Sequence, residues 1–359
     1  MKFDFVIGNP PFNETTEVNN RSGALYPLFY DEAKTLTDKY LLISPARFLF
    51  NAGLTSKEWN KKMLSDPHLK VEYFNKVSGE VFANTDIKGG VAIIYRDATQ
   101  NFGAIEEFIP DENLRNLLSE IKKTDYVPMT NIMYGGRSDL KFNELYLQHY
   151  PNTKEDRLKA IQKKHPKVLK LGVNEEYELK SPTLDILDYT FYNEEPKNKE
   201  DYYKLLGLVG KERVYRWIER KFMTPRYDDN NINHYKVFIP KAIGSGRFGE
   251  VMSTAVAAEP GTSSTPTFIS IGKFNTIEEA ENTIKYTKTK FARALLGVLK
   301  ITQDNIPSKW KYVPVQNFTN SSDIDWGKSI SDIDKQLYKK YKLKQKEIDF
   351  IEENVKEMK

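Results

Sequence analysis

The sequence contains no cysteine. This absence excludes disulfide bonds, cysteine-ligated zinc and a thiol nucleophile. Histidine is also scarce, and its four positions show no metal-ligand spacing: His68, His149, His165 and His234. We therefore predict no metal site and no chemistry that depends on a cysteine.

The sequence also lacks a long hydrophobic run. No stretch approaches the ~18–20 apolar residues that a membrane span needs, and no signal peptide opens the chain. We therefore expect a cytoplasmic protein with no membrane partner. With 359 residues, 39% of them hydrophobic and 13% aromatic, the chain is long enough for a globular fold of two domains.

The net charge of +4 is unevenly distributed. Residues 1–125 hold 15 Lys and Arg against 18 Asp and Glu, whereas residues 126–359 hold 39 against 32. A basic second part suggests an anionic partner, although an excess of this size is also common by chance.

Strand and helix patterns alternate over the first 100 residues, which predicts an α/β domain around a sheet. The strand-like segments are residues 3–7, 39–44, 70–75 and 89–97, and the helical ones are 25–36 and 56–64. Ligand sites gather at the carboxyl ends of strands in such sheets.

A turn-rich segment at residues 127–136 marks a change of pattern. We predict a first domain over residues 1–125, a second over 126–325 and C-terminal helices over 326–359. In the second domain, residues 154–164, 211–223 and 276–299 have helical patterns. Residues 234–242, 267–272 and 312–318 resemble strands, and residues 332–358 resemble two helices.

The first apolar strand stops at Gly8-Asn9-Pro10-Pro11-Phe12. The simplest interpretation is a tight turn, because Asn-Pro pairs commonly begin turns. A chemical interpretation accounts for each residue. The Asn9 side-chain oxygen and the Pro10 carbonyl would accept the two hydrogens of an adenine amine, and the prolines would hold these acceptors in place. Phe12 would stack on a base rotated out of the duplex.

The segment "FDFVIGNPPF" resembles the catalytic motif of adenine-specific DNA methyltransferases, especially the methylase part of fused type II restriction–modification enzymes. The similarity continues in order over nearly the whole chain. Three segments resemble the remainder of the methylase: residues 25–36, 39–53 and 79–97. Residues 337–358 resemble the usual C-terminus of the family. The others resemble the target-recognition region: residues 207–222, 237–251, 286–304 and 312–318.

This resemblance implies a fold and a set of roles. The fold would be a partial Rossmann-like methyltransferase sheet followed by an α+β target-recognition domain. Asn9 and Pro10 would hold the amine, and Phe12 and Phe82 would sandwich the base. Pro11 would shape the pocket beside the methyl group of S-adenosylmethionine, and double-stranded DNA would be the partner.

The sequence departs from the family in one respect. The family's cofactor loop, an aromatic-x-Gly-x-Gly turn, precedes the catalytic motif by many residues, whereas eight residues precede Asn9 here. We expect the latter part of a longer enzyme, with a separate polypeptide supplying the cofactor-binding and nuclease parts. The alternatives are a catalytically inactive, sequence-specific DNA-binding module and an unrelated α/β protein with a chance turn.

A glycine pattern at Gly244-x-Gly246-x-x-Gly249 allows two interpretations. It could be a nucleotide-binding loop, since residues 235–239 resemble a strand, but Pro240 and Lys241 intervene and residues 251–264 predict only a weak helix. The resemblance favours a recognition loop in which Arg247 approaches DNA.

Basic residues interleaved with aromatic ones are the remaining candidates for DNA contact. The competing interpretation is an amphipathic helix with a solvated face. The candidates are Arg137, Arg213, Arg216, Arg220, Arg247, Lys288, Lys290 and Arg293. Glu178-x-Lys180 could suggest a nuclease, but it lacks a preceding Pro-Asp partner, and we interpret it as a solvated charge pattern.

Overall fold

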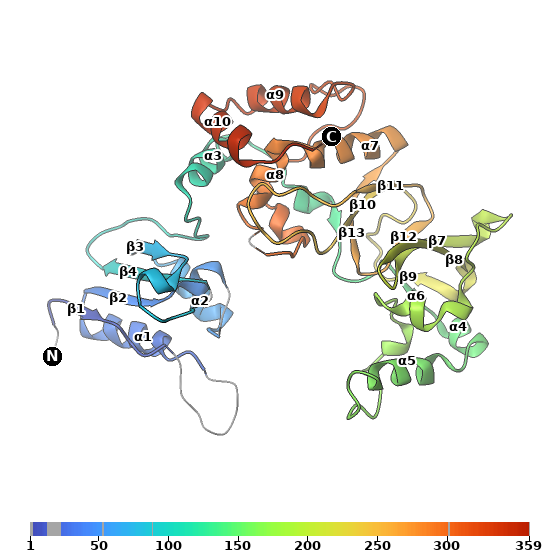
Figure 1. The fold of residues 1–359 in the computed structure, drawn as a ribbon, viewed down its shortest axis with the longest axis horizontal. Coiled ribbons are helices and arrows are strands. Elements are labelled where there is room, and N and C mark those ends of the chain that lie inside the picture. The colour runs from blue at the N-terminus through green and yellow to red at the C-terminus, as the bar shows by residue number, and fades with distance from the viewer. Residues whose placement is uncertain (1–2, 13–22, 52–53, 88, 301, 359) are drawn as a thin grey trace. The chain divides into compact units, whose positions relative to one another are not determined.

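The computed structural model describes residues 3–12, 23–51, 54–87, 89–300 and 302–358. The chain divides into two compact units, Met1–Asp111 and Glu112–Lys359 (Figure 1). The division falls before α3 (Glu112–Lys122), whereas the sequence suggested a boundary at residue 125. The difference arises because α3 contributes Leu117 and Ile121 to the core of the second unit.

The first unit is built on a four-stranded sheet in the order β1-β2-β4-β3. Its strands are β1 (Val6–Gly8), β2 (Lys39–Pro45), β3 (Leu69–Asn75) and β4 (Val91–Asp97). β1 and β2 run parallel, and β4 runs antiparallel to both β2 and β3. The predicted mixed α/β character is confirmed. A Rossmann-like sheet stays a prediction, because only one pair of these strands is parallel.

Two helices pack on the sheet of the first unit: α1 (Tyr26–Leu36) and α2 (Lys57–Leu64). Pro27 stands in the first turn of α1, where its missing N–H removes no helical hydrogen bond. The Ser56 hydroxyl accepts a hydrogen bond from the Trp59 amide and caps α2. Both helices lie where the sequence predicted them.

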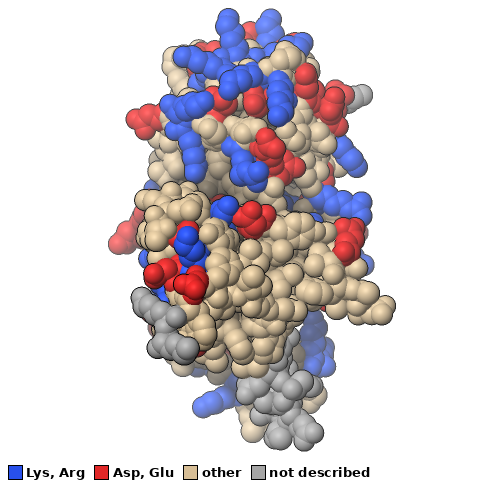
Figure 2. Space-filling model, turned by 90° about the vertical axis from the view of Figure 1, so that its left-hand side faces the viewer, with Lys and Arg blue, Asp and Glu red and all other residues tan. Residues whose placement is uncertain are grey.

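The first unit exposes apolar side chains in β1 and in the residues just before it. Ile7 is 75% exposed, Phe3 is 50% exposed, and Phe5 is 39% exposed. Figure 2 shows a face of the molecule on which uncharged residues form a broad area. Within the described residues, β1 pairs with β2 alone, so its other edge is open. Such an edge offers unpaired backbone groups to another chain.

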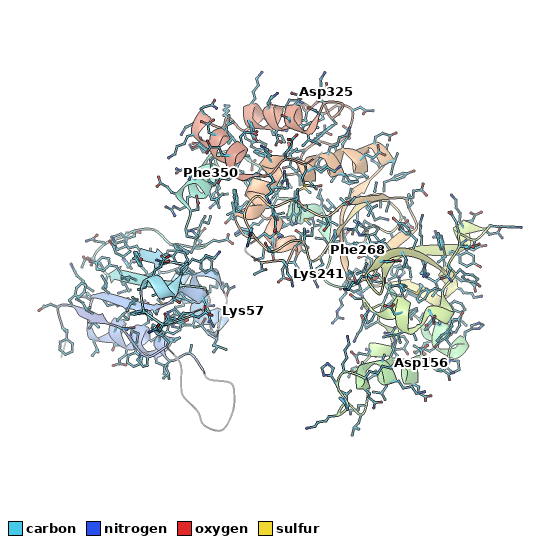
Figure 3. The ribbon with its side chains drawn as sticks, in the orientation of Figure 1. Lys57, Asp156, Lys241, Phe268, Asp325 and Phe350 are labelled. Atoms are coloured by element: carbon cyan, nitrogen blue, oxygen red, sulfur yellow. The ribbon has the colours of Figure 1, made fainter. Side chains whose placement is uncertain are left out.

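The described residues of the second unit form three small sheets. The first has the order β11-β10-β13-β5 and the second β12-β7-β8, while β6 pairs with β9. The strands are β5 (Met133–Tyr134), β6 (Leu140–Phe142), β7 (Tyr202–Val209), β8 (Glu212–Glu219), β9 (Met223–Pro225), β10 (Tyr235–Pro240), β11 (Val256–Ala258), β12 (Thr262–Ser264) and β13 (Phe268–Phe274). In Figure 3, Phe268 marks the region where the first two sheets meet, in a cluster with Leu206 and Phe238.

Helices surround these sheets. They are α4 (Glu144–His149), α5 (Thr153–Gln162), α6 (Thr183–Ile186), α7 (Ile277–Lys288), α8 (Lys290–Gly297), α9 (Ile330–Lys340) and α10 (Gln345–Asn354). The two C-terminal helices bring Leu337 and Ile351 into the same core as α7 and α8. No helix in the described part of the chain is long and apolar enough to cross a membrane.

Several predictions of local structure were wrong. Residues 211–223 form strand β8 and a 3₁₀ turn rather than a helix, because β8 pairs with β7 across a turn at Gly210, whose φ is +60°. The weak helix at residues 251–264 is replaced by β11 and β12, and the helix at 276–299 is divided at Thr289. The segment 312–318 makes one isolated bridge, at Pro314.

Candidate functional site

The segment Asn9–Phe12 follows the carboxyl end of β1 directly. Pro10 is buried, Asn9 and Pro11 are exposed, and Phe12 is half-buried. The Leu25 amide donates a hydrogen bond of 3.1 Å to the Phe12 carbonyl, which ties the segment to the start of α1. β1 and β2 are parallel, so this segment and the residues after β2 both lie at the carboxyl ends of their strands, on the same end of the sheet.

Phe12 and Phe82 come together in the structure. Their ring centroids are 6.3 Å apart, and their planes are inclined at 61°. Phe82 lies after the 3₁₀ turn Ser78–Glu80, and its amide donates to the Ser78 carbonyl at 2.8 Å. The buried Ser78 hydroxyl in turn accepts a hydrogen bond from the Ile87 amide at 2.7 Å. The two rings that were predicted to flank a base are therefore neighbours, held on separate ordered segments.

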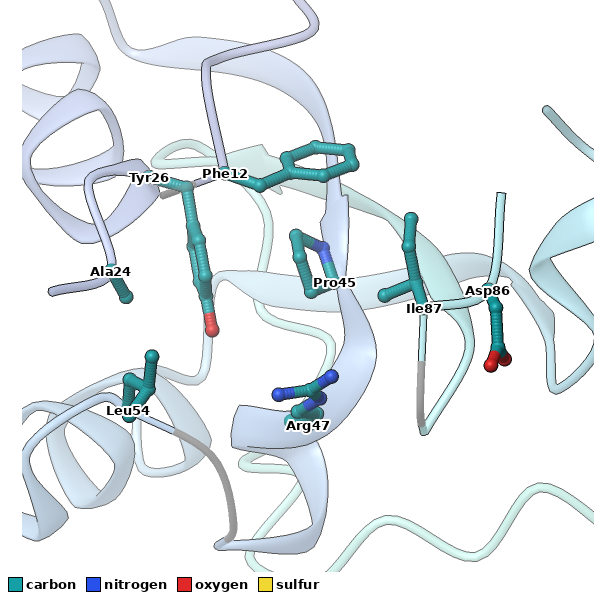
Figure 4. A pocket seen from close by; sticks show the side chains of 8 residues that line it. All are labelled: Phe12, Ala24, Tyr26, Pro45, Arg47, Leu54, Asp86 and Ile87. Carbon is teal, nitrogen blue, oxygen red and sulfur yellow. The ribbon is translucent and has the colours of Figure 1, made fainter. Parts of the chain in front are cut away.

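A pocket of 130 Å³ opens beside Phe12 (Figure 4). Its lining comes from the segment Asn9–Phe12, from α1 and the loop before it, from the end of β2 and the 3₁₀ turn after it, and from the loops before α2 and β4: Phe12, Ala24, Tyr26, Pro45, Arg47, Leu54, Asp86 and Ile87. In Figure 4, Phe12 and Arg47 lie on opposite sides of Pro45. The pocket thus combines apolar walls with two charged groups.

The hydroxyl of Tyr26 is the third polar group of the pocket. Burial raises the pKa of Tyr26 to about 12, while the Thr55 hydroxyl and the Arg47 guanidinium act in the opposite direction. Like an ordinary tyrosine, Tyr26 is protonated at neutral pH, and the raised pKa extends this form to higher pH.

Sequence reasoning missed Tyr26, Arg47 and Asp86. Arg47 stands two residues after Pro45, which ends β2, and this position at a strand end was the available signal. Asp86 reaches the pocket through the antiparallel pairing of β2 with β4, in which Pro45 faces Val91. A single sequence contains no local signal for that pairing.

The predicted basic residues of β8 and of the 3₁₀ turn Arg220–Phe222 after it have mixed environments. Arg213 is exposed and donates to the Thr254 carbonyl at 2.7 Å. Arg216 is half-buried and donates to the Tyr215 carbonyl at 2.9 Å. Arg220 is half-buried, and its guanidinium carbon lies 4.6 Å from the centre of the Tyr203 ring. β8 is an edge strand of its sheet.

The remaining basic candidates differ in exposure. Arg137 is 67% exposed at its side chain and lies 3.8 Å from the Glu178 carboxylate. Arg247 is exposed and Lys288 is half-buried. The Lys290 ammonium pairs with the Glu352 carboxylate at 2.5 Å.

Arg293 is 3% exposed, which differs from the expectation that it offers its charge to DNA. Its guanidinium donates to the carbonyls of Lys288, Glu250 and Lys356. These contacts join α8 to the C-terminal segment, so Arg293 belongs to the interior of the second unit.

The glycine loop at residues 244–249 is occupied by a side chain of the protein itself. The Glu250 carboxylate accepts hydrogen bonds from the Ser245 amide at 2.8 Å and the Gly246 amide at 2.9 Å. It also pairs with the Lys300 ammonium at 2.7 Å. Burial would raise the pKa of Glu250, but these hydrogen bonds outweigh it and lower the pKa to about 2. The amides that a phosphate would need already have an anionic partner.

Glu178 takes part in an internal ion pair rather than in a solvated pattern, since the Arg226 guanidinium donates to its two oxygens at 3.0 and 2.7 Å. Among the described residues, no group of three or more His, Asp or Glu side chains is arranged to hold a metal ion.

Comparison with known proteins gives one family. Residues 1–82 match the model of the Eco57I restriction-modification methylase family. No curated protein matches the chain. One similar solved structure is the type IIL restriction-modification enzyme MmeI in complex with DNA, at 10% sequence identity and a TM-score of 0.39. The match covers 98% of this chain and 56% of that one, so the chain spans little more than half of that enzyme's length. The first 82 residues are thus similar to a restriction–modification methylase.

Proposed function

We propose that this chain supplies the amine-binding part of the active site and the target-recognition part of an adenine-specific DNA methyltransferase of a restriction–modification system. The observation that carries the proposal is the segment Asn9–Phe12 at the end of β1, within the 82 residues that match the methylase family. Phe12 and Phe82, 6.3 Å apart, support the capture of a base beside it.

The chemistry assigned to the motif is the activation of a weak nucleophile. The lone pair of an adenine amine is delocalised into the ring. The Asn9 side-chain oxygen and the Pro10 carbonyl accept the two N–H hydrogens, which favours a tetrahedral nitrogen with a localised lone pair. Acceptors held in place before the reaction stabilise the charge that develops on the amine in the transition state. The exposure of Asn9 leaves this oxygen accessible to a base.

The base must leave the duplex to reach this segment, because its amine is otherwise paired. Phe12 and Phe82 would take the two faces of its ring. In the second unit, the exposed Arg137, Arg213 and Arg247 are the cations best placed to meet DNA phosphates or base edges. Arg216, Arg220 and Lys288 are half-buried and would make secondary contacts. Lys290 forms an ion pair with Glu352 and Arg293 is buried, so neither is proposed as a DNA contact.

The described residues do not by themselves form a site for S-adenosylmethionine, which would supply the methyl group. The pocket of 130 Å³ is lined by Phe12 rather than by Pro11, and the Glu250 carboxylate fills the glycine loop. In this proposal, Pro11 is the one residue of the described chain that is assigned a position beside the methyl group of S-adenosylmethionine. The open, apolar edge of β1 supports a second polypeptide that completes the site.

The first experiment is calorimetric titration of the chain with S-adenosylmethionine, followed by incubation with unmethylated DNA and mass spectrometry of the nucleosides. Binding in the micromolar range corresponds to about −8 kcal/mol and would mean that the chain completes the cofactor site. If no binding is seen, the titration is repeated with candidate partner polypeptides.

In the active preparation we expect N6-methyladenine as the product. Asn9→Ala should abolish transfer while DNA affinity stays within twofold, and Asn101→Ala, at an exposed asparagine of the same unit, should have no effect. Methylation on the carbon of cytosine, or full activity of Asn9→Ala, would refute the proposal.

A second candidate function is a DNA-binding module without transferase activity. The occupied glycine loop and the absence of a donor site among the described residues favour it. DNA binding without S-adenosylmethionine binding, alone or with any partner, would identify this function.

A further inference from the structure

The turn between α9 and α10 carries a dense group of lysines. Residues 335–346, which run from the second half of α9 to the start of α10, contain six lysines and no aspartate or glutamate. In Figure 2, Lys and Arg side chains gather at the top of the view, the level at which Figure 1 draws α9 and α10. Five of the six lysines are exposed, and Lys340 is half-buried: Lys335, Lys339, Lys340, Lys342, Lys344 and Lys346.

Only half of these lysines have an acidic partner. Three of the six form ion pairs with carboxylates of the protein: Lys335 with Asp332, Lys340 with Asp323 and Lys344 with Glu120. Within the described part of the chain, no carboxylate pairs with the other three, which are Lys339, Lys342 and Lys346. The ammonium groups of these three lysines are therefore available to an anion from outside the chain.

Helix α3 extends the positive surface. α10 lies against α3 (Figure 1), and Glu120 of α3 accepts hydrogen bonds from both Lys344 and Lys123. The two ion pairs measure 2.8 and 2.7 Å, so one carboxylate lies between two ammonium groups. Lys122, next to Lys123, is exposed. The α9–α10 turn and the end of α3 therefore form one surface with an excess of positive charge.

Lys342 has a backbone conformation that lysine rarely adopts. Its φ is +52°, in the left-handed region, and it follows Tyr341, the C-cap of α9. Its amide donates to the Lys339 carbonyl at 3.1 Å, and the Leu343 amide donates to the Tyr338 carbonyl at 3.0 Å. Glycine is the usual residue at such a helix end, because a Cβ is unfavourable there. Lysine at this position lowers the stability of the fold, which indicates a use for its side chain.

Lys344 and Lys346 also stand where a positive charge is locally unfavourable. Lys344 is the N-cap of α10, and Lys346 lies in its first turn. The free N–H groups at this end of a helix favour acidic side chains and disfavour cations. Lys339 differs, because it stands in the last turn of α9, where a cation is favourable. Helix stability thus explains Lys339 and does not explain the lysines that follow it.

We propose that Lys339, Lys342 and Lys346 bind phosphates of the backbone of double-stranded DNA. The inference rests on the proposed function in taking DNA as the anionic partner. Duplex DNA carries one negative charge per about 1.7 Å of helix axis, so several unpaired cations on one turn can each meet a phosphate. Lysine binds a phosphate as a point charge, and such contacts position a protein on the duplex without reading its sequence.

The test measures DNA affinity and protein stability in the same variants. Fluorescence anisotropy with a labelled duplex of random sequence gives the slope of log affinity against log salt concentration. The triple variant Lys339→Gln, Lys342→Gln, Lys346→Gln should reduce this slope by about 0.9 for each lysine.

The matched control removes the same charge from three exposed lysines that lie outside the helices and strands: Lys164→Gln, Lys167→Gln and Lys170→Gln. The control should leave the slope unchanged. Circular dichroism verifies that both triple variants are folded.

Lys342→Gly separates DNA binding from folding. Glycine relieves the left-handed backbone and removes the ammonium group, so the melting temperature should rise by about 2–4 °C while the slope falls by about 0.9. Lys342→Glu keeps the unfavourable backbone and reverses the charge. It should lower the affinity further than Lys342→Gly, with no rise in the melting temperature.

The proposal is overturned by an unchanged slope in the triple variant, by an equal loss in the control, or by a wild-type affinity that does not depend on salt. A lower melting temperature in Lys342→Gly would also overturn it, because the lysine would then serve the fold. Failure of the proposed function is a separate result, because it is measured as the methylated nucleoside and through Asn9→Ala.

Discussion

Phe12 and Phe82 lie edge to face, with their ring centroids 6.3 Å apart and an angle of 61° between their planes. A base stacked between two rings needs them roughly parallel and about 7 Å apart, twice the contact distance of carbon atoms. The distance between the ring centroids is therefore close to the one needed to stack a base between the rings, but the angle between the ring planes is too large. Capture of a base would therefore require one ring to rotate and the two rings to move slightly apart.

Phe82→Ala should weaken capture of an unpaired base. A stacked base contributes about 1–3 kcal/mol, which is roughly a 5- to 150-fold change in affinity. The measurement is a fluorescence titration with a trinucleotide whose central base is 2-aminopurine, because stacking quenches its emission. Phe82→Trp should retain the quenching.

The matched control for this titration is Phe102→Ala. Phe102 packs with Tyr95, at 6.0 Å between ring centroids, and does not line the pocket. Equal losses in Phe82→Ala and Phe102→Ala would show that the first unit has been disturbed generally, and that Phe82 has no special role.

The ion pair between Asp66 and Arg96 should make the first unit sensitive to acid. The Arg96 Nε donates to Asp66 at 2.8 Å, and Lys34 donates to the same oxygen at 3.0 Å. Burial would raise the pKa of Asp66, but the hydrogen bonds from Arg96, Lys34 and the His68 amide outweigh it and lower the pKa to about 2. The folded-state pKa lies below the unfolded value of about 4, so the stabilisation is complete above pH 4. It is lost as the pH falls toward 2.

Asp66→Asn should flatten this pH dependence and cost about 3–5 kcal/mol at neutral pH, because it leaves the buried Arg96 without its anion. Hydrogen exchange of the β2 and β4 amides, followed by mass spectrometry, measures the stability of this unit. Asp31→Asn removes an exposed pair with Lys62 and should cost less than about 1 kcal/mol. A similar loss in both variants would contradict the prediction.

Local sequence patterns were sufficient to predict most of the first unit. Helix α1 carries Pro27 in its first turn and α2 begins directly after Ser56, and both residues are start signals that a sequence displays directly. The strand β8 was mistaken for a helix because Arg213, Arg216 and Arg220 recur at helical spacing. Its pairing with β7 decides the conformation, and that pairing depends on contacts outside the segment.

The candidate site divides in the same way. Asn9 to Phe12 are adjacent in the chain, so the sequence alone shows that they lie together, while the role proposed for them stays a prediction. Arg47 and Asp86 reach the pocket through the register of β2 with β4 and through the Ala46–Gly90 hydrogen bond. The burial of Arg293 depends equally on remote carbonyls, and its sequence context resembles that of an exposed cation.

Gly249→Ala should destabilise the contact between the glycine loop and the C-terminal segment. Gly249 has a φ of +69°, and a Cβ there would lie 2.0 Å from the Asn354 carbonyl oxygen. The Lys356 amide also donates to the Gly249 carbonyl at 2.9 Å. Thermal unfolding followed by circular dichroism measures the effect.

Gly210→Ala is the matched control, since Gly210 has a φ of +60° and open space around its missing Cβ. It should cost about 1–2 kcal/mol through the backbone conformation alone. Gly249→Ala adds a steric clash of about 1–3 kcal/mol. Equal losses of stability in the two variants would mean that the C-terminal segment moves away from the added Cβ without a measurable loss of free energy of unfolding.

Arg247→Ala and Arg293→Ala separate a DNA contact from an internal one. The Glu250 carboxylate shapes the loop that carries the exposed Arg247, so this cation is presented on an ordered backbone. If Arg247 meets a phosphate, its removal reduces the slope of log affinity against log salt concentration by about 0.9. Arg293→Ala should leave that slope unchanged and instead lower the free energy of unfolding by about 1–3 kcal/mol, because buried carbonyls lose their donor.

Fluorescence anisotropy with a labelled duplex at several salt concentrations measures the slope, and urea unfolding measures the stability. An unchanged slope in Arg247→Ala would remove the glycine loop from the DNA interface, and a reduced slope in a folded Arg293→Ala would show that the interior of the second unit opens when DNA binds.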